Sequence, residues 1–326
     1  MLRYLVFFVS TGFYSQIYAQ STAGVTGKPD TSYSINSAYR STVKTHPGIK
    51  IVKEFKSPSV TEKRNIVYCT SGDRSLLLDA FYPSANSKIS RPAVLVVHGG
   101  GWRTGNRSQH YPLAQRLAAL GYVCFTPEYR LSTDALYPAA VHDIKSAVRW
   151  MRAHAKEYGI DTGKIAVLGF SAGGELAAFV GATNNIVRFE GDGCELNYSS
   201  AVQAIVDMDG ILSFVHPESG EGDDSRSTSA ATHWFGYPKK DNPALWEDAS
   251  ALTHVGAHTP PSLFINSAVD RMHAGREDFR KVLDQHGIYS EVHSFEGAPH
   301  SFPLFNPWFE PTLKYVDDFL RKVFKR

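Results

Sequence analysis

Five consecutive apolar residues at 93–97 are typical of a β-strand that is buried on both faces of a sheet. Such strands occur in parallel sheets, whose two faces are both covered by helices. From residue 65 onward, short apolar runs alternate with longer segments in which apolar residues recur at helical spacing. This alternation predicts an α/β fold with a mostly parallel central sheet and helices on both faces.

The predicted elements follow one another at short intervals along the chain. Strands are expected at 65–70, 75–81, 93–97, 122–126, 164–169, 204–208, 263–266 and 291–295. Helices are expected at 113–120, 137–151, 172–183, 279–287 and 313–323. Residues 216–246 interrupt this rhythm, because they are polar, rich in Gly and Ser and dotted with aromatic residues. We expect them to form a small insertion over one end of the sheet.

The amino-terminal part of the chain differs in composition from the rest. Arg3, an apolar stretch at 4–14 and Ala19 predict a signal peptide over residues 1–19, and hence a secreted or periplasmic protein. Residues 20–60 are rich in Ser and Thr and lack periodicity, so they are expected to form an N-terminal extension or tether. Residues 61–326 are then the domain that contains the sheet.

Charge and hydropathy exclude two classes of partner. The 326 residues include 34 Lys and Arg against 32 Asp and Glu, which gives a formal charge of +2 without any basic block. We therefore expect no nucleic-acid partner. No apolar run reaches 18 residues, so no stable membrane insertion is expected of the mature chain. The oligomeric state is not determined by these features.

Three cysteines form a poor disulfide framework. Cys124 lies in an apolar run and is expected in the core. Cys69 and Cys194 have no local feature that supports a bridge, so the sequence leaves open whether they pair.

The segment Gly169-Phe170-Ser171-Ala172-Gly173 matches the pattern G-x-S-x-G. It stands between a predicted strand and a predicted helix. There, small residues allow a sharp turn that presents the serine hydroxyl above the edge of the sheet. This setting makes Ser171 a candidate nucleophile.

A second motif, His98-Gly99-Gly100-Gly101-Trp102, follows the strand at 93–97. Consecutive glycines let backbone N–H groups turn toward a developing oxyanion without obstruction by a Cβ atom. The expected donors are Gly99, Gly100 and Ala172, the residue after the nucleophile. His98 is expected to be structural.

A serine hydroxyl needs a general base and a carboxylate that orients it. His300 follows the last predicted strand, where the base of such a site is expected. Asp270, just after the strand at 263–266, is the preferred acid. Asp209, which ends the preceding strand, is the alternative.

Taken together, these motifs resemble those of the α/β-hydrolase esterases, in particular the bacterial acetyl esterase and feruloyl esterase relatives of hormone-sensitive lipase. The resemblance runs from about residue 65 to 324. It implies that residues 61–326 are an α/β-hydrolase catalytic domain with the triad Ser171, Asp270 and His300. It also implies that Glu128, Arg130 and Asp143 are structural.

The expected function is therefore that of an exported serine carboxylesterase that removes acetyl groups from cell-wall carbohydrate such as xylan or pectin. No motif for a metal or cofactor occurs, so none is expected. Trp102, Trp234 and Trp308 are candidates for stacking on sugar rings, with core packing as the alternative for each. Three other functions stay open: a feruloyl or methyl esterase, a serine peptidase of the prolyl-oligopeptidase kind, and a catalytically inactive binding module.

Overall fold

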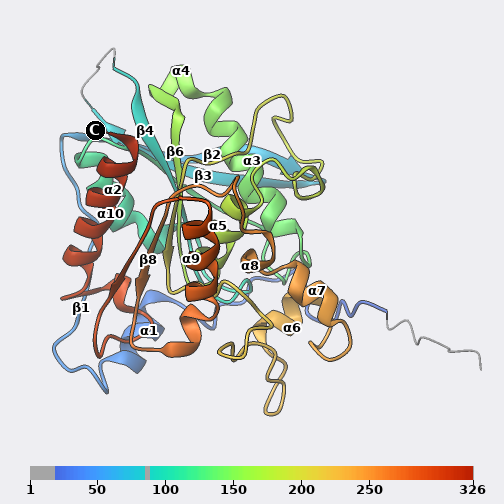
Figure 1. Cartoon of the computed structure of the whole chain (residues 1–326). Coiled ribbons are helices and arrows are strands. Elements are labelled where there is room, and N and C mark those ends of the chain that lie inside the picture. The colour runs from blue at the N-terminus through green and yellow to red at the C-terminus, as the bar shows by residue number, and fades with distance from the viewer. Residues whose placement is uncertain (1–18, 85–88, 326) are drawn as a thin grey trace, which may run out of the picture.

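An eight-stranded sheet runs through the centre of the molecule in the order β2-β3-β5-β4-β6-β7-β8-β9 (Figure 1). The computed structural model describes residues 19–84 and 89–325. A separate antiparallel pair is formed by β1 and β10. The strands are β1 Lys50–Ile51, β2 Val60–Ser71, β3 Arg74–Pro83, β4 Arg91–Val97, β5 Val123–Pro127, β6 Ile160–Phe170, β7 Ala204–Met208, β8 Ser262–Asn266, β9 Ser290–Ser294 and β10 Phe305–Asn306.

Strand directions confirm the predicted mostly parallel sheet. Neighbouring strands from β5 to β9 pair in parallel, whereas β2 and β3 add an antiparallel edge. The helices are α1 Ile35–Thr42, α2 Tyr111–Ala119, α3 Ala139–Ala153, α4 Ala155–Tyr158, α5 Ala172–Ala182, α6 Ala230–Phe235, α7 Pro243–Asp248, α8 Ala251–His254, α9 Arg276–Gln285 and α10 Phe309–Phe324. None of the helices in the described part of the chain is both long and apolar enough to cross a membrane.

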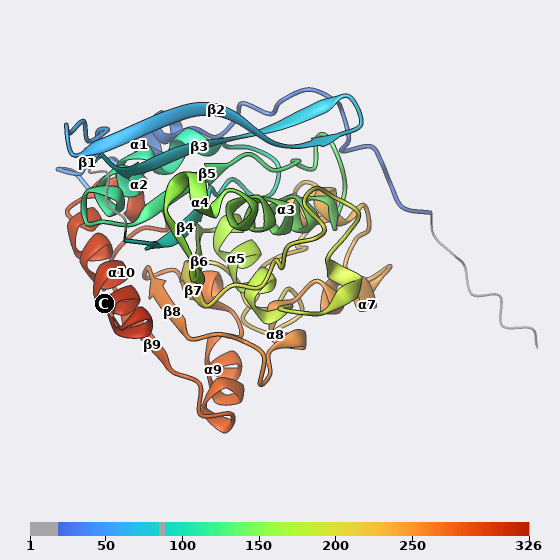
Figure 2. The same cartoon turned by 90° about the horizontal axis from the view of Figure 1, so that it is seen from above.

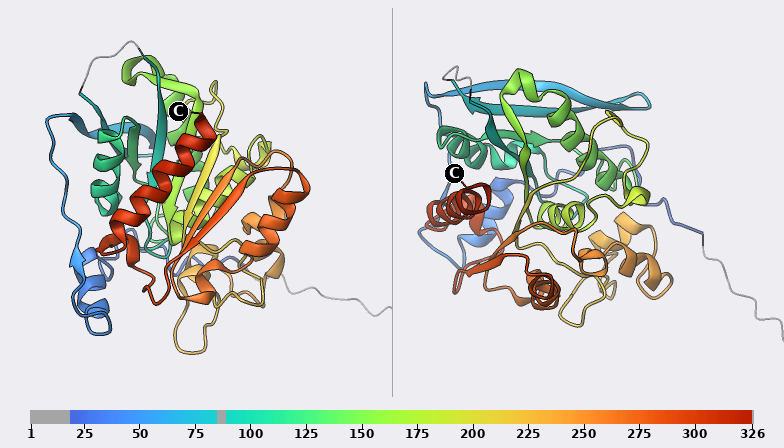
Figure 3. Two further views of the ribbon diagram at one scale, coloured as in Figure 1. Left: turned by 60° about the vertical axis from the view of Figure 1, so that its left-hand side comes forward. Right: turned by 45° about the horizontal axis from the view of Figure 1, so that its top comes forward.

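Two hydrophobic cores lie on opposite faces of the sheet. Side chains of β4 alternate between them: Leu95 and Val97 belong to one core, and Val94 and Val96 to the other. Helices α3, α5 and α9 cover the first core, and α2 and α10 cover the second (Figure 2). Figure 3 shows the twisted sheet between these helical layers from two further directions. The apolar run at 93–97 is therefore buried on both faces, as its composition predicts.

The segment at 20–60 packs on the domain that contains the sheet. It includes helix α1 and strand β1, which were not predicted from the sequence. Helix α1 begins with a capping box, in which the side chains of Ser34 and Ser37 each accept a hydrogen bond from the other residue's backbone N–H. Strand β1 pairs with β10 next to the last helix. The predicted signal peptide lies outside the described residues, apart from Ala19.

The predicted insertion at 216–246 contains helices α6 and α7. Its aromatic side chains point inward: Trp234 and Trp246 are completely buried, and both contact Phe235 and Phe214. The aromatic side chains of the insertion therefore belong to the same core as those of α5.

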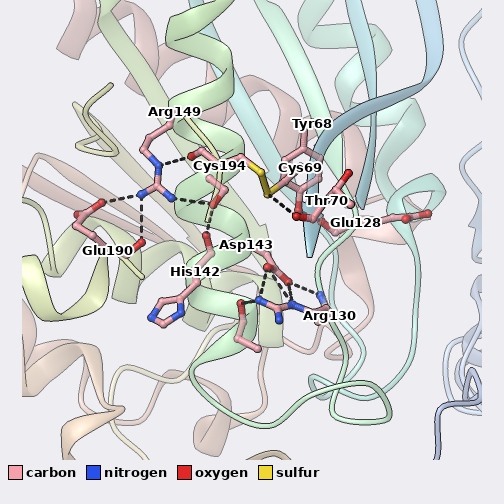
Figure 4. The surroundings of a disulfide bond; sticks show 12 residues. Tyr68, Cys69, Thr70, Glu128, Arg130, His142, Asp143, Arg149, Glu190 and Cys194 are labelled. Carbon is pink, nitrogen blue, oxygen red and sulfur yellow. Dashed lines mark hydrogen bonds and ion pairs between the residues drawn. A yellow bond between two sulfur atoms is a disulfide. The ribbon is translucent and has the colours of Figure 1, made fainter. Parts of the chain in front are cut away.

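A disulfide joins Cys69 in β2 to Cys194 in the long loop after α5 (Figure 4). The same loop is held by buried Arg149, whose Nε donates to the Cys194 carbonyl at 2.8 Å. Arg149 also forms an ion pair with Glu190, at 2.9 Å between Nη1 and Oε2. The bridge closes a chain segment of 125 residues. The pairing that the sequence left open is therefore present in the structure.

Removing this disulfide should destabilise the protein. The variant with both Cys69→Ala and Cys194→Ala should lose about 2–5 kcal/mol of unfolding free energy, because the unbridged unfolded chain gains conformational freedom. Chemical unfolding measured with and without reductant tests this directly. Reductant should lower wild-type stability to that of the double variant and leave the double variant unchanged. Equal stability of the two proteins under oxidising conditions would contradict the prediction.

Candidate active site

Three polar residues from different parts of the chain meet at the carboxyl ends of the parallel strands. Ser171 directly follows β6, Asp209 directly follows β7, and His300 lies in the loop after β9. Ligands of open α/β sheets bind at this edge, because the loops there carry the side chains that the strands position.

Ser171 has a backbone conformation that non-glycine residues rarely adopt, with φ 57° and ψ −123°. Two close backbone contacts around it require glycine. A Cβ atom on Gly169 would lie 1.8 Å from the Gly173 carbonyl oxygen, and one on Gly173 would lie 2.3 Å from the Val97 carbonyl oxygen. The pattern G-x-S-x-G thus allows β6, β4 and α5 to approach one another closely, which holds the serine in its exposed turn.

His300 connects Ser171 to Asp209 through both of its ring nitrogens. Its Nε2 lies 2.9 Å from the Ser171 Oγ, and its Nδ1 lies 2.9 Å from the Asp209 Oδ2. With Nδ1 protonated and bonded to the carboxylate, Nε2 is the acceptor for the serine proton. The predicted nucleophile and base therefore lie within hydrogen-bond distance of each other.

Asp209 is completely buried, and the carboxylate oxygen that does not face His300 also accepts hydrogen bonds. Its Oδ1 accepts hydrogen bonds from the Ser267 backbone N–H at 2.8 Å and from the Asn266 Nδ2 at 3.4 Å. Both donors stand at the end of β8, the strand next to β7. These bonds hold the carboxylate in the orientation in which Oδ2 faces His300.

The prediction that Asp270 orients His300 is wrong. Asp270 begins a 3-10 turn, its side chain is 100% exposed, and its nearest imidazole is that of His273 at 4.0 Å. After the buried Ser267, Ala268 and Asp270 are exposed, so the Asp270 carboxylate faces solvent. The alternative, Asp209, occupies the place beside His300.

One of the three N–H groups that were predicted to bind the oxyanion is occupied in the structure. The N–H of Gly99 donates to the side-chain Oε1 of Gln109 at 2.8 Å, so it is not available to an oxyanion. The N–H groups of Gly100, Gly101 and Ala172 have no acceptor within the described residues. We therefore assign the oxyanion hole to Gly100, Gly101 and Ala172, and correct the assignment of Gly99. The φ angles of 132° at Gly100 and 57° at Gly101 explain why this turn needs glycine.

A buried carboxyl group holds the end of this turn. The indole N–H of Trp102 donates to Oε2 of Glu175 in α5 at 2.9 Å. Burial raises the pKa of Glu175 well above its usual range, and the nearby Asp207 carboxyl raises it further against the effect of the Trp102 hydrogen bond. Glu175 therefore links the glycine turn at 99–101 to α5, the helix that follows Ser171.

The three candidate sugar-stacking tryptophans differ in whether they reach the site. Trp102 is 4% exposed and stacks on Trp234, which is 0% exposed, with ring centroids 5.0 Å apart. The assignment of Trp234 to substrate binding is therefore wrong, because the ring is in the core of the insertion. Trp308 lines a separate cavity with His46 and Asn306 and neither of the cavities at Ser171, so its role in substrate binding stays a prediction. Trp102 alone reaches a cavity at Ser171.

The residues expected to be structural are engaged away from the triad. His98 is buried, with its Nδ1 2.9 Å from the Gly99 carbonyl oxygen, and burial lowers its pKa to about 4. Arg130 and Asp143 form a two-pronged ion pair. Glu128 pairs with Arg107.

Two cavities meet at Ser171 and His300. The smaller, of about 210 Å³, is lined mainly by apolar side chains, including Trp102, Ile211 and Met272. The larger, of about 430 Å³, is lined partly by apolar surface that includes Phe170 and Ala230. Side chains with polar groups also reach it from three parts of the chain: Asp30, Ser32, Tyr33, Arg103, Thr104, Thr228 and His233. Asp30, Ser32 and Tyr33 were not predicted to lie there, because residues 20–60 contain no motif that indicates a place beside Ser171.

Within residues 19–84 and 89–325, no group of three or more His, Cys, Asp or Glu side chains is arranged to hold a metal ion. The acidic residues of the 216–246 insertion are instead engaged with the protein. Asp224 bonds to Ser229 and Thr232, and Glu221 pairs with Arg271.

Comparisons with known proteins agree with this geometry. The chain is 31% identical over 231 residues to the probable carboxylic ester hydrolase LipM of Mycobacterium tuberculosis, an alignment that covers 66% of this chain and 52% of that protein. The chain spans 52–60% of the length of the first curated relatives it matches.

Solved structures share the fold over most of the chain. A truncated carbohydrate esterase from gut microbiota superposes with a TM-score of 0.68 at 22% identity, over 82% of this chain and 99% of that one. The esterase Est2 of the planctomycete Thermogutta terrifontis gives a TM-score of 0.65 at 27% identity, over 82% and 93%. Est2 has also been solved with propionate and with butyrate bound.

The family model BD-FAE matches residues 78–275, more than half of the chain, and this range includes Ser171 and Asp209. With its sheet order, its glycine turns and these matches, the chain has the α/β-hydrolase fold and belongs to the BD-FAE family.

Proposed function

We propose that this protein is a serine carboxylic ester hydrolase. The observation that carries the proposal is the position of His300, which lies 2.9 Å from both the Ser171 hydroxyl and the Asp209 carboxylate. This is the arrangement that acyl transfer by a serine nucleophile requires. The three N–H groups of the oxyanion hole add the second requirement, stabilisation of the charge that develops on the carbonyl oxygen.

In the acylation step, the Ser171 Oγ attacks the ester carbonyl carbon while His300 Nε2 takes the hydroxyl proton. The negative charge on the tetrahedral oxygen is stabilised by Gly100, Gly101 and Ala172. The C–O bond to the alcohol then breaks, and the His300 imidazolium returns the proton to the departing alcohol. Asp209 stabilises this imidazolium through its contact with Nδ1.

In the deacylation step, a water molecule replaces the alcohol. His300 takes a proton from this water, and the hydroxide attacks the acyl carbon on Ser171. Collapse of the second tetrahedral intermediate releases the acid and returns the proton to Ser171. Every proton in this cycle moves through His300, so the chemistry calls for no metal or cofactor.

The smaller cavity fits the acyl group. Gly101 and Ala172 of the oxyanion hole belong to its lining, as do the apolar side chains of Trp102, Ile211 and Met272. An ion pair between Glu221 and Arg271, at 3.1 Å, completes the wall. For this cavity we propose a short acyl group such as acetyl, in keeping with the short acids, propionate and butyrate, that have been found bound to Est2.

Chain-length selectivity should follow from this wall. We expect 4-nitrophenyl acetate to be hydrolysed with a kcat/KM at least roughly 100-fold higher than 4-nitrophenyl octanoate, since each methylene that cannot fit costs about 1–3 kcal/mol. The variant Arg271→Ala should open the wall and raise the octanoate-to-acetate ratio. Equal or faster hydrolysis of the octanoate by the wild type would reject the short-acyl assignment.

For the alcohol, we propose an acetylated carbohydrate such as a xylan or pectin fragment. The larger cavity supports this, because the polar groups of Asp30, Ser32 and Tyr33 in its lining offer both donors and acceptors to a polyhydroxylated ligand. The 22% identical neighbour named a carbohydrate esterase shares the fold. Acid and alcohol analysis after incubation with acetylated and feruloylated polysaccharides tests the proposal. Acetate release supports it, whereas release of ferulate or methanol without acetate would move the substrate to another cell-wall ester.

We also propose that the protein is exported to the periplasm or the medium. The disulfide between Cys69 and Cys194 supports this, because such bridges persist in oxidising compartments. Expression in a bacterial host followed by intact-mass analysis of the exported fraction should give a chain that begins at Gln20. Recovery of the full-length chain from the cytoplasm alone would contradict export.

A further inference from the structure

Residues 24–33 run alongside the oxyanion turn, and we call them the N-terminal strap. Arg103, the residue after the glycine motif and Trp102, holds the strap at two points. Its Nη1 donates to the Gly24 carbonyl at 3.2 Å, and its Nε lies 3.0 Å from the Asp30 carboxylate. Asp30 also forms a β-bridge with Thr104. In Figure 1 this part of the chain, in dark blue, passes beside α6 before it reaches α1.

Further contacts fix the strap against the insertion. Gly24 lies so close to His233 of α6 that a Cβ atom there would stand 2.8 Å from the ring Nδ1. The Gly27 N–H donates to the Thr133 carbonyl at 2.8 Å. The strap is therefore an ordered part of the wall between the oxyanion turn and α6.

The strap contributes three side chains to the larger cavity, namely Asp30, Ser32 and Tyr33. Asp30 is ion-paired with Arg103 and accepts from the Ser32 N–H at 2.9 Å, and its two oxygens keep lone pairs for further donors. The Tyr33 hydroxyl has no hydrogen-bond partner among the residues that the structure describes. Burial raises the pKa of Tyr33 to about 12, so the hydroxyl stays protonated and can donate.

The position of this cavity relative to the triad determines which half of an ester it can receive. The two cavities share Gly101, Ser171, Ala230 and His300. An ester whose carbonyl carbon lies at Ser171 must therefore extend into both, with one half in each. Since we propose the smaller cavity for a short acyl group, the alcohol half extends into the larger one, which the side chains of the strap reach.

We infer that the N-terminal strap is part of the alcohol-binding site, where Asp30 and Tyr33 hydrogen-bond the hydroxyl groups of a sugar whose ester is cleaved at Ser171. This inference rests on the proposed function. It assigns a specificity role to residues outside the range 78–275 that the family model matches.

The test compares two acetate esters that differ in their alcohol. Acetylated xylo-oligosaccharide reaches the strap, whereas methyl acetate has an alcohol of one carbon and does not. The variants are Asp30→Asn and Tyr33→Phe, and the matched control is Lys28→Ala, an exposed strap residue that does not line the cavity. Release of acetate is followed for both esters.

We expect Asp30→Asn to lower kcat/KM for the oligosaccharide roughly tenfold or more, and Tyr33→Phe by about 3–10-fold, mainly through KM. For methyl acetate both variants should stay within about twofold of wild type, and Lys28→Ala should match wild type on both esters. Equal losses on both esters would show that the strap only supports the oxyanion turn, and would overturn the inference. Unchanged kinetics on both would overturn it as well.

The activity of the wild-type protein on the two esters distinguishes a failure of the esterase proposal from a failure of the inference about the strap. A wild-type protein that hydrolyses neither ester would overturn the esterase proposal and this inference together. Hydrolysis of methyl acetate but not of the oligosaccharide would leave the esterase proposal intact and overturn the carbohydrate site.

Discussion

Replacing Asp209 with asparagine should lower kcat for ester hydrolysis about 10⁴-fold. The carboxylate accepts the Nδ1–H of His300, which leaves Nε2 free to take the Ser171 proton. An asparagine that turns its amide group toward the ring donates instead, which favours the tautomer with the proton on Nε2. Such an imidazole cannot act as the base.

Asp270→Asn is the matched control for this prediction. It makes the same chemical change at a carboxylate that is fully exposed and 4.0 Å from the nearest imidazole, so activity should stay within about twofold of wild type. Hydrolysis of 4-nitrophenyl acetate, measured on variants with wild-type circular dichroism, compares the two. A large loss for Asp270→Asn with a small one for Asp209→Asn would contradict the assignment of the acid.

Ser171→Ala should reduce kcat by roughly 10⁴–10⁶-fold, since the oxyanion hole and substrate binding alone retain only modest catalysis. KM should change little, because the serine oxygen contributes to the transition state more than to substrate binding. Ser225→Ala, at an exposed position in the insertion, is the control and should behave like wild type. Substantial residual activity in Ser171→Ala that copurifies with the protein would contradict a nucleophilic role.

The parts of the fold that the sequence predicted are those where local pattern and burial agree. The apolar run at 93–97 forms strand β4, which is buried on both faces. The turn around Ser171 needs small residues because the backbone of the helix comes very close to that of the strand there. Helix α1 was not predicted, because its residues are mostly polar and its start depends on a side-chain cap, which is a weak signal in a Ser-rich segment.

The identity of the triad acid depends on which loop bends toward His300. Asp209 and Asp270 both follow strands at the correct edge, and chain order allows either. What distinguishes them is the backbone N–H of Ser267, which bonds Asp209 and belongs to a loop 58 residues away. The sequence Asp207-Met208-Asp209-Gly210, with an acid directly after the strand next to that of the nucleophile, was the one local hint.

The roles of the oxyanion donors and of the tryptophans also depend on the tertiary structure, so the sequence did not predict all of them correctly. Which of three consecutive glycines directs its N–H outward is decided by φ angles and by the acceptor on Gln109, neither of which a run of glycines specifies. Trp102 and Trp234 stack on each other because the insertion closes over them. The sequence alone does not distinguish an aromatic residue that faces a ligand from one that packs in a core.

The most direct test of the triad is covalent labelling with a 4-nitrophenyl phosphonate, followed by intact-protein and peptide mass spectrometry. The hydrogen bonds of His300 predict one phosphonyl group per chain on Ser171, one equivalent of released 4-nitrophenolate, and loss of esterase activity in step with labelling. Ser171→Ala should take up no label. A phosphonyl group on another residue, or full activity in a chain labelled at Ser171, would contradict Ser171 as the nucleophile.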